Sequence, residues 1–197
     1  MSEDTRLPGL PRYVRLNTIK TSFNDAKKEL VQTGHIFEPP PTGARQAQLQ
    51  KVPSGGRSYR MDEHCPDLLV FRPKGQSDVS RVPMVARGEL IIQQKASCFP
   101  ALALAPPAGS VVIDGCAAPG NKTCHIAALM GNQGRVIAFE QDERRCNLLR
   151  SMMGQKGATI VEVPCPHPTS APTPFPPRPH PTSTPFPPGA PWELPRL

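Results

Sequence analysis

Residues 110–123 read SVVIDGCAAPGNKT, and this stretch decides which fold the chain can adopt. Ser110 to Asp114 is an apolar run of the kind that forms a buried β-strand, and Asn121 to Met130 has the apolar spacing of a helix. The small residues between them let the backbone come close to a ligand. A strand, a glycine-containing loop and a helix in this order are typical of nucleoside-binding α/β domains.

The same alternation continues downstream of this stretch. Residues 135–140 form a second apolar run, a helix is expected from Asp142 to Gly154, and residues 158–163 form a third run. Strands that alternate with helices at this spacing predict a parallel sheet, so we expect an α/β fold with a Rossmann-like domain. The second helix is expected to bury three apolar side chains: Leu148, Leu149 and Met152.

The sequence changes character at Pro164, after only three predicted strands. We therefore expect an incomplete sheet with an unpaired edge and an exposed apolar face. Of the 27 prolines, 14 fall in the last 34 residues, and the motif PHPTS occurs there twice. Such a segment forms no packed core and favours polyproline-like or disordered chain. It is interpreted either as a ligand for a proline-binding module or as a neutral tail produced by altered splicing or a frameshift.

The N-terminal part has a different pattern. Short strands are predicted at residues 13–17, 35–37 and 67–71, and Asn24 and Gly34 are expected to bound a short helix. Residues 38–60 are rich in Pro, Gly, Gln and Arg and predict a loop or insertion.

The domain division follows from these patterns. We predict an α+β module at 1–87, a Rossmann-like domain at 88–163 that includes a helix at 95–104, and a disordered Pro-rich tail at 164–197.

The formal net charge is +7, and residues 1–100 hold 15 Lys and Arg against 10 Asp and Glu. A basic front half suits a polyanionic partner such as RNA or DNA, and it equally suits a merely solvated basic surface. The six cysteines show no C-x-x-C spacing, so no metal site is expected. The sequence shows neither a signal segment nor an apolar run of membrane-spanning length. We therefore expect no membrane partner and a reduced compartment with free thiols.

Residues 114–123 also suggest a chemistry. Backbone amides at a helix N-terminus bind anionic groups, and Glu140 lies 26 positions after Asp114, near the spacing at which a carboxylate binds ribose hydroxyls. The pattern indicates a nucleoside cofactor and leaves NAD and S-adenosylmethionine open. The absence of G-x-G-x-x-G disfavours NAD, and Asn121 displaces Lys122 from its position in an ATP-binding P-loop.

Three segments carry a resemblance to a known family. Residues 116–123 (CAAPGNKT) resemble the cofactor loop of the Sun-domain, or RsmB/Nop-type, RNA cytosine-5 methyltransferases. Residues 12–18 (RYVRLNT) resemble the family's N-terminal RNA-binding segment, and residues 88–97 resemble the segment that leads into its catalytic domain. The most similar subgroup modifies large-subunit ribosomal RNA, and the resemblance extends from about Leu10 to Val163. Two departures are Gln94 and Glu140, where the family usually has Asp.

The resemblance implies S-adenosylmethionine as cofactor, ribosomal RNA as partner, and the nucleus, in particular the nucleolus, as location. It implies a cofactor site made of Cys116, Ala117, Ala118, Pro119, Gly120, Asn121, Lys122, Glu140 and Arg145. It also implies RNA-binding residues, for which we take Arg12, Arg15, Asn17 and Lys20.

Methylation of cytosine C5 requires a thiolate that adds to C6, which makes C5 nucleophilic toward the methyl group. The family resembled uses one cysteine for this attack and a second for product release, in Pro-Cys and Thr-Cys contexts after the fourth and fifth strands. Pro164-Cys165 follows the third predicted strand instead, so we assign no catalytic residue. We expect an inactive, shortened methyltransferase. The alternatives are a non-catalytic RNA- or cofactor-binding product and an interaction protein that acts through its Pro-rich tail.

Overall fold

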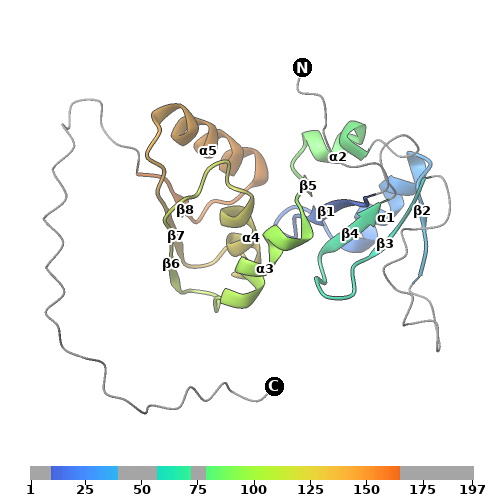
Figure 1. The fold of residues 1–197 in the computed structure, drawn as a ribbon, viewed down its shortest axis with the longest axis horizontal. Coiled ribbons are helices and arrows are strands. Elements are labelled where there is room, and N and C mark those ends of the chain that lie inside the picture. The colour runs from blue at the N-terminus through green and yellow to red at the C-terminus, as the bar shows by residue number, and fades with distance from the viewer. Residues whose placement is uncertain (1–9, 40–56, 72–78, 165–197) are drawn as a thin grey trace, which may run out of the picture. The chain divides into compact units, whose positions relative to one another are not determined.

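The computed structural model describes residues 10–39, 57–71 and 79–164, which form two β-sheets with their helices (Figure 1). The expected tail lies outside the described residues, as does most of the predicted loop at 38–60. The α/β fold class with a Rossmann-like parallel sheet is confirmed. Among the described residues, no helix is long and apolar enough to cross a membrane.

The first sheet has five strands in the order β2-β3-β4-β1-β5. Its strands are β1 (Arg12–Leu16), β2 (Ile36–Phe37), β3 (Ser58–Met61), β4 (Leu68–Phe71) and β5 (Leu90–Ile92). β1 pairs antiparallel with β4 on one side and with β5 on the other. β1 has a neighbour on each side, and its residues are almost entirely buried, including Arg12 and Arg15, which were assigned to RNA binding.

Two features of this sheet differ from the sequence-based prediction. β3 begins inside the stretch predicted as a loop, at Ser58, and pairs parallel to β2. β5 belongs to this sheet, since Val14 is paired with Ile92, although the predicted module boundary was placed after residue 87. Because β5 pairs with β1, the first sheet extends to Ile92.

Helix α1 (Phe23–Gln32) packs on the first sheet through Ala26 and Leu30. Its N-cap is Ser22, whose hydroxyl accepts from the Asp25 backbone N–H at 3.2 Å, and not Asn24 as predicted. A serine hydroxyl reaches this amide readily, which explains the earlier start. A short 3-10 turn, η2 (Val79–Arg81), and α2 (Pro83–Ala86) precede β5.

The second sheet contains β6 (Val111–Asp114), β7 (Arg135–Ala138) and β8 (Val161–Glu162), all parallel and in chain order. Helix α3 (Lys95–Leu104) leads into β6, α4 (Asn121–Leu129) connects β6 to β7, and α5 (Glu143–Lys156) connects β7 to β8 (Figure 1). Parallel strands place their carboxyl ends along one edge, so the residues after β6 and those after β7 lie side by side.

Three details of this sheet correct the sequence-based prediction. β6 was expected to be buried, but Val111 and Ile113 are 60% and 68% exposed, because in the described residues β6 has β7 as its only neighbour and one face is uncovered. Helix α5 continues past Gly154 to Lys156 and ends at Gly157, whose positive φ caps it. Its inner face uses Leu149 and Met153, while Leu148 is exposed.

Cys98, Cys124 and Cys146 lie in helices and are fully buried. Cys65, Cys98, Cys116 and Cys124 have free thiols. Cys146 is disulfide-bonded, which differs from the expectation of free thiols throughout.

Candidate functional site

The loop between β6 and α4 is fixed by a carboxylate at the end of β6. Asp114 Oδ2 accepts from the Thr123 hydroxyl at 2.7 Å, and Asp114 Oδ1 accepts from the Cys116 backbone N–H at 3.3 Å. Thr123 is fully buried in the first turn of α4, so its contact with Asp114 closes the loop across its base. The peptide bond between Ala118 and Pro119 is cis. These contacts hold the backbone of residues 115–120 as a defined turn.

The start of α4 has no side-chain cap. Its N-cap is Gly120, which has a φ of 94°. The first hydrogen bond within the helix is donated by the Cys124 backbone N–H to the Gly120 carbonyl at 2.9 Å. The backbone N–H groups of the first turn therefore have no carbonyl of a preceding turn to bond. Such amides, together with the positive end of the helix dipole, favour an anionic group of a ligand.

Gly120 is also required by packing. A Cβ built on it would lie 2.7 Å from Leu149 Cδ1 and still nearer to Met153 Cε. The loop thus rests directly on the side chains of α5, and a side chain at this position would force the ends of Leu149 and Met153 to shift. A positive φ and a close neighbour together restrict this position to glycine.

Glu140 and Arg145 join the loop to the end of β7. The Arg145 guanidinium lies 3.3 Å from Glu140 Oε2 and donates to the Ala118 carbonyl at 3.0 Å. Glu140 Oε1 accepts from the Asp142 backbone N–H at 3.1 Å. The Glu140 side chain is 7% exposed, whereas that of Arg145 is 57% exposed. The structure therefore brings Glu140, Arg145 and the 116–120 loop together.

The remaining residues of the predicted cofactor site lie around the same loop. Cys116, Pro119 and Lys122 are exposed, while Ala117 and Ala118 are buried beneath the loop backbone. Asn121, half-buried, is the first residue of α4, and its amide oxygen accepts from the Lys156 ammonium at 2.8 Å. All nine predicted positions thus fall on the loop, on α4 or α5 beside it, or at the end of β7.

The residues expected to bind RNA lie elsewhere and are mostly buried. Arg15 and Asn17 are 1% and 0% exposed, and Arg12 is 9% exposed. Arg15 Nε donates to Gln93 Oε1 at 2.9 Å, and Asn17 Nδ2 donates to the carbonyls of Gly88 and Lys156, both at 2.8 Å. Arg15 and Asn17 thus hydrogen-bond to other segments of the chain, and their assignment to RNA binding stays a prediction.

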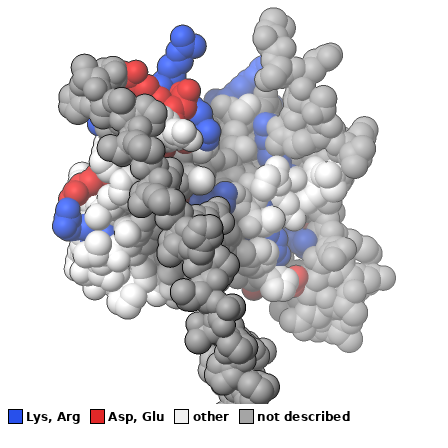
Figure 2. All heavy atoms as spheres, turned by 60° about the vertical axis from the view of Figure 1, so that its left-hand side comes forward, with Lys and Arg blue, Asp and Glu red and all other residues white. Residues whose placement is uncertain are grey.

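Lys20 alone of these four is exposed, and its ammonium donates to the backbone carbonyls of Arg87 and Gln155. On the face drawn in Figure 2, Lys and Arg side chains lie at several separate places, with acidic side chains beside some of them. The Lys and Arg side chains coloured on this face are thus not gathered into one patch.

Two buried cysteines outside the loop are poor nucleophiles. Burial raises the pKa of the Cys98 thiol to about 11 and raises the pKa of Cys65 as well. A thiol attacks as its thiolate, so both are disfavoured at neutral pH. In the described part of the chain, no group of three or more His, Cys, Asp and Glu is placed to hold a metal ion.

The sequence did not reveal two contacts that shape this site, which are those of Thr123 with Asp114 and of Lys156 with Asn121. The bond between Asp114 and Thr123 could have been suspected from an acidic strand end and a hydroxyl in the next first turn. Lys156 had no such signal, because a lysine in the last turn of a helix is ordinarily a solvated residue near the negative dipole end. Here it is 2% exposed and reaches Asn121.

Comparison with known families assigns two parts of the chain. Residues 10–93 match the ferredoxin-like domain of NOL1/NOP2/Sun domain family member 5, and residues 101–171 match the 16S rRNA methyltransferase RsmB/F family. The first match ends within one residue of the last strand of the five-stranded sheet, and the second begins in α3.

Individual relatives agree with these matches. The chain is 41% identical over 155 residues to a 28S rRNA (cytosine-C(5))-methyltransferase of Mus musculus, covering 78% of this chain and 32% of the relative. It is 40% identical over 153 residues to the 25S rRNA (cytosine-C(5))-methyltransferase NSUN5 of Arabidopsis thaliana, covering 78% and 23%. The chain thus spans a third or less of the length of these two relatives.

Among solved structures, a methyltransferase homologue from Pyrococcus horikoshii is similar with a TM-score of 0.58 and 30% sequence identity. The match covers 78% of this chain and 43% of that one. The likeness therefore includes both sheets of this chain.

Proposed function

Because the chain belongs to the Sun-domain, or RsmB/Nop-type, family of RNA cytosine-5 methyltransferases, we propose that residues 114–123 bind the methyl donor S-adenosylmethionine. The observation that carries the proposal is the junction of Ala118, Glu140 and Arg145 beside the uncapped start of α4. It offers backbone amides for the carboxylate of the donor's methionine part and a carboxylate for its ribose hydroxyls.

The methionine carboxylate and the ribose of the donor would each be held by a distinct group. The free amides of the first turn of α4 would accept the carboxylate of the methionine part, with Lys122 exposed at the same turn. Glu140 would accept from the ribose hydroxyls with the lone pairs that Arg145 and Asp142 leave unused. Gly120 lets the loop backbone lie close to the Leu149 and Met153 side chains of α5.

The relatives' printed names extend the proposal to the acceptor. They describe methylation of 28S and 25S ribosomal RNA at cytosine C5. We propose that the protein acts in this subgroup, with large-subunit ribosomal RNA as partner and the nucleolus as location. Lys20 is the one predicted RNA contact that remains exposed, and the net charge of +7 favours association with RNA.

We further propose that the 197-residue chain binds the donor but does not transfer the methyl group by itself. Attack on cytosine C6 needs a thiolate, and burial of Cys65 and Cys98 raises the pKa of each thiol. Cys124 is fully buried in α4, and Cys116 is a small residue of the donor loop. The described residues therefore supply donor binding without an activated nucleophile.

Isothermal titration calorimetry of the 197-residue chain with S-adenosylmethionine tests donor binding, with NAD and ATP as controls. We expect heat of binding with the methyl donor and none with the controls. Absence of binding to S-adenosylmethionine would refute the first proposal. Transfer of tritium from methyl-labelled donor to ribosomal RNA tests the second, and incorporation clearly above a no-protein control would show that the chain is active.

A further inference from the structure

A buried lysine reaches the donor loop from the far end of α5. Lys156, the last residue of α5, is 2% exposed, and its ammonium donates to Asn121 Oδ1 at 2.8 Å. Asn121 directly follows Gly120 and opens α4. The position of the first turn of α4, where the free amides lie, is thus set in part by one hydrogen bond from Lys156.

The same asparagine also contacts the first sheet. Asn121 Nδ2 lies 3.5 Å from the carbonyl of Ile92, the last residue of β5. The Asn121 amide group is therefore held on its oxygen side by α5 and approached on its nitrogen side by β5. An amide held by both ends has one orientation, which fixes the side chain and the helix start that carries it.

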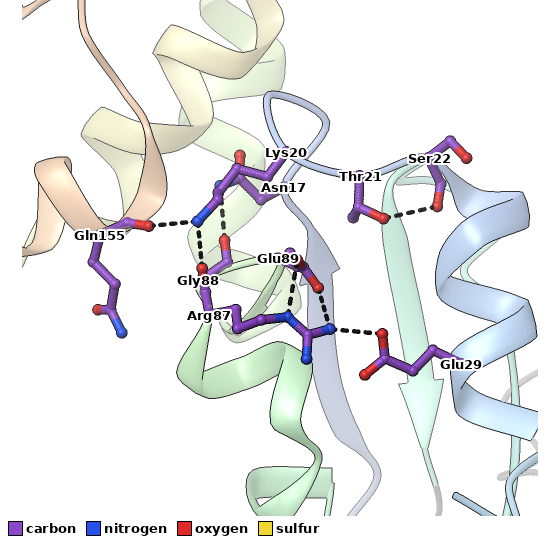
Figure 3. A network of polar contacts seen from close by, with 9 residues as sticks. All are labelled: Asn17, Lys20, Thr21, Ser22, Glu29, Arg87, Gly88, Glu89 and Gln155. Atoms are coloured by element: carbon purple, nitrogen blue, oxygen red, sulfur yellow. Dashed lines mark hydrogen bonds and ion pairs between the residues drawn. The ribbon is translucent and has the colours of Figure 1, made fainter. Parts of the chain in front are cut away.

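The end of α5 is fastened to the first sheet by two more groups. Asn17, at the end of β1, donates to the Lys156 carbonyl and to the Gly88 carbonyl, both at 2.8 Å. Lys20 donates to the Gln155 carbonyl at 3.0 Å and to that of Arg87, and Figure 3 shows its ammonium between the two. Gly88 permits this approach, since a Cβ there would lie 2.9 Å from the Gln155 carbonyl oxygen.

Burial of the Lys156 ammonium costs desolvation free energy, which a side chain that only fills space would not incur. Burial lowers the pKa of Lys156 to about 8, and the nearby Arg15 guanidinium lowers it further while Cys124 acts in the opposite direction. An apolar side chain of similar length would fill the same space without the desolvation penalty. A buried charge that makes one directed hydrogen bond indicates a requirement at the acceptor, which here is Asn121.

We propose that Lys156 is a positioning residue for the methyl-donor site, and that the N-terminal sheet is part of the framework that holds this site through Asn17 and β5. The proposal rests on the proposed donor binding at residues 114–123 and assigns a role to residues outside that loop. It implies that the donor loop is correctly held only when the first sheet is present and docked on the end of α5.

The test compares Lys156→Met with a matched control, Arg144→Met, which removes an exposed cation from the same helix. Donor binding is measured by calorimetry at pH 7, and amide hydrogen exchange is followed by mass spectrometry over residues 115–124. For Lys156→Met we expect affinity for S-adenosylmethionine to fall about tenfold and exchange in 115–124 to accelerate, because the lost hydrogen bond is directed and buried. Arg144→Met should match the wild-type chain in both measurements.

Two further readouts separate positioning from general stability. Lys156→Arg keeps a cation that can donate to the Asn121 amide and should recover affinity to within about threefold of wild type. Donor affinity of the wild-type chain should also weaken as pH rises through about 8, because the charged donor of the hydrogen bond is lost, and the Met variant should lack this dependence. The groups around Lys156 are Arg15 from β1, Lys20 after β1 and Cys124 from α4.

The outcomes distinguish the two proposals. If the wild-type chain binds no S-adenosylmethionine, the proposed function fails, and hydrogen exchange still decides whether Lys156 holds the loop. If Lys156→Met leaves hydrogen exchange in residues 115–124 unchanged, the positioning role is refuted, whatever the change in affinity for S-adenosylmethionine. Loss of affinity without recovery in Lys156→Arg would also contradict it.

Discussion

The Arg145 guanidinium lies 3.3 Å from Glu140 Oε2 and at the same time donates to the Ala118 carbonyl at 3.0 Å. One side chain of α5 therefore joins the end of β7 to the loop after β6. The Glu140 side chain is nearly buried, and Arg145 and the Asp142 backbone N–H each contact one of its carboxylate oxygens. The carboxylate is consequently held in a fixed place beside the loop, where we propose that it binds the ribose of the donor.

Glu140→Gln tests this carboxylate. The substitution keeps the size of the side chain and removes the charge that strengthens hydrogen bonds from ribose hydroxyls, so we expect affinity for S-adenosylmethionine to fall about tenfold. Calorimetry measures the loss. Glu162→Gln is the control, because Glu162 is a carboxylate in the adjacent strand β8 that pairs with Arg135 at 2.8 Å. Equal affinity in the two variants would show that Glu140 does not contact the donor.

Gly120→Ala tests the packing of the loop on α5. The new Cβ would meet Leu149 and Met153 at a residue whose φ is 94°, so steric overlap and backbone strain both act on the folded chain. We expect the free energy of unfolding in urea to fall by about 2 to 4 kcal/mol. Gly115→Ala is the control, because its φ is ordinary and no atom lies within 4 Å of the added Cβ. Similar stability of both variants would contradict this account.

The pH dependence of stability tests the burial of Lys156. Its pKa is lowered from 10.5 to about 8 by burial, so between these values the unfolded chain binds more protons than the folded chain. The contribution of Lys156 to stability therefore rises with pH from about 8 upward. The raised pKa of the buried Cys98 thiol acts in the opposite direction, so wild type must be compared with Lys156→Met.

The comparison is made by urea unfolding at several pH values between 7 and 9.5. We expect the difference in unfolding free energy, wild type minus Lys156→Met, to increase with pH across this window. The corresponding difference for Arg144→Met should stay constant, since Arg144 is exposed. A constant difference for Lys156→Met would mean that the ammonium is not buried in solution.

The exposed face of β6 predicts self-association of the 197-residue chain. Val111 and Ile113 are 60% and 68% exposed, and in the described residues β6 is paired on one side alone. An apolar edge strand of this kind invites pairing with another chain. Ile113→Lys should therefore reduce association measured by dynamic light scattering at a given concentration. Val136→Lys, at a buried position of β7, should instead unfold the chain, and unchanged scattering in Ile113→Lys would contradict the prediction.

Local sequence signals were enough to predict the parallel sheet and the donor loop. The apolar runs around Ile113 and Val136, the intervening glycines and the acidic strand end at Glu140 are all short-range patterns, and strand-helix alternation leaves few arrangements for them. The helix at 95–104 was predicted with the bounds that the structure has. Element ends were less certain, as Ser22 and Gly157 show, because neighbouring residues compete for the capping position.

By itself, the sequence determined that residues 110–123 form a strand, a tight loop and a helix start, since these depend on residues close together in the chain. Only the tertiary structure decided that Arg15 and Asn17 are buried, that β5 joins the first sheet and that Lys156 reaches Asn121. Each of these depends on which segments pair across long separations, and a polar residue carries the same sequence signal whether it is solvated or buried with partners.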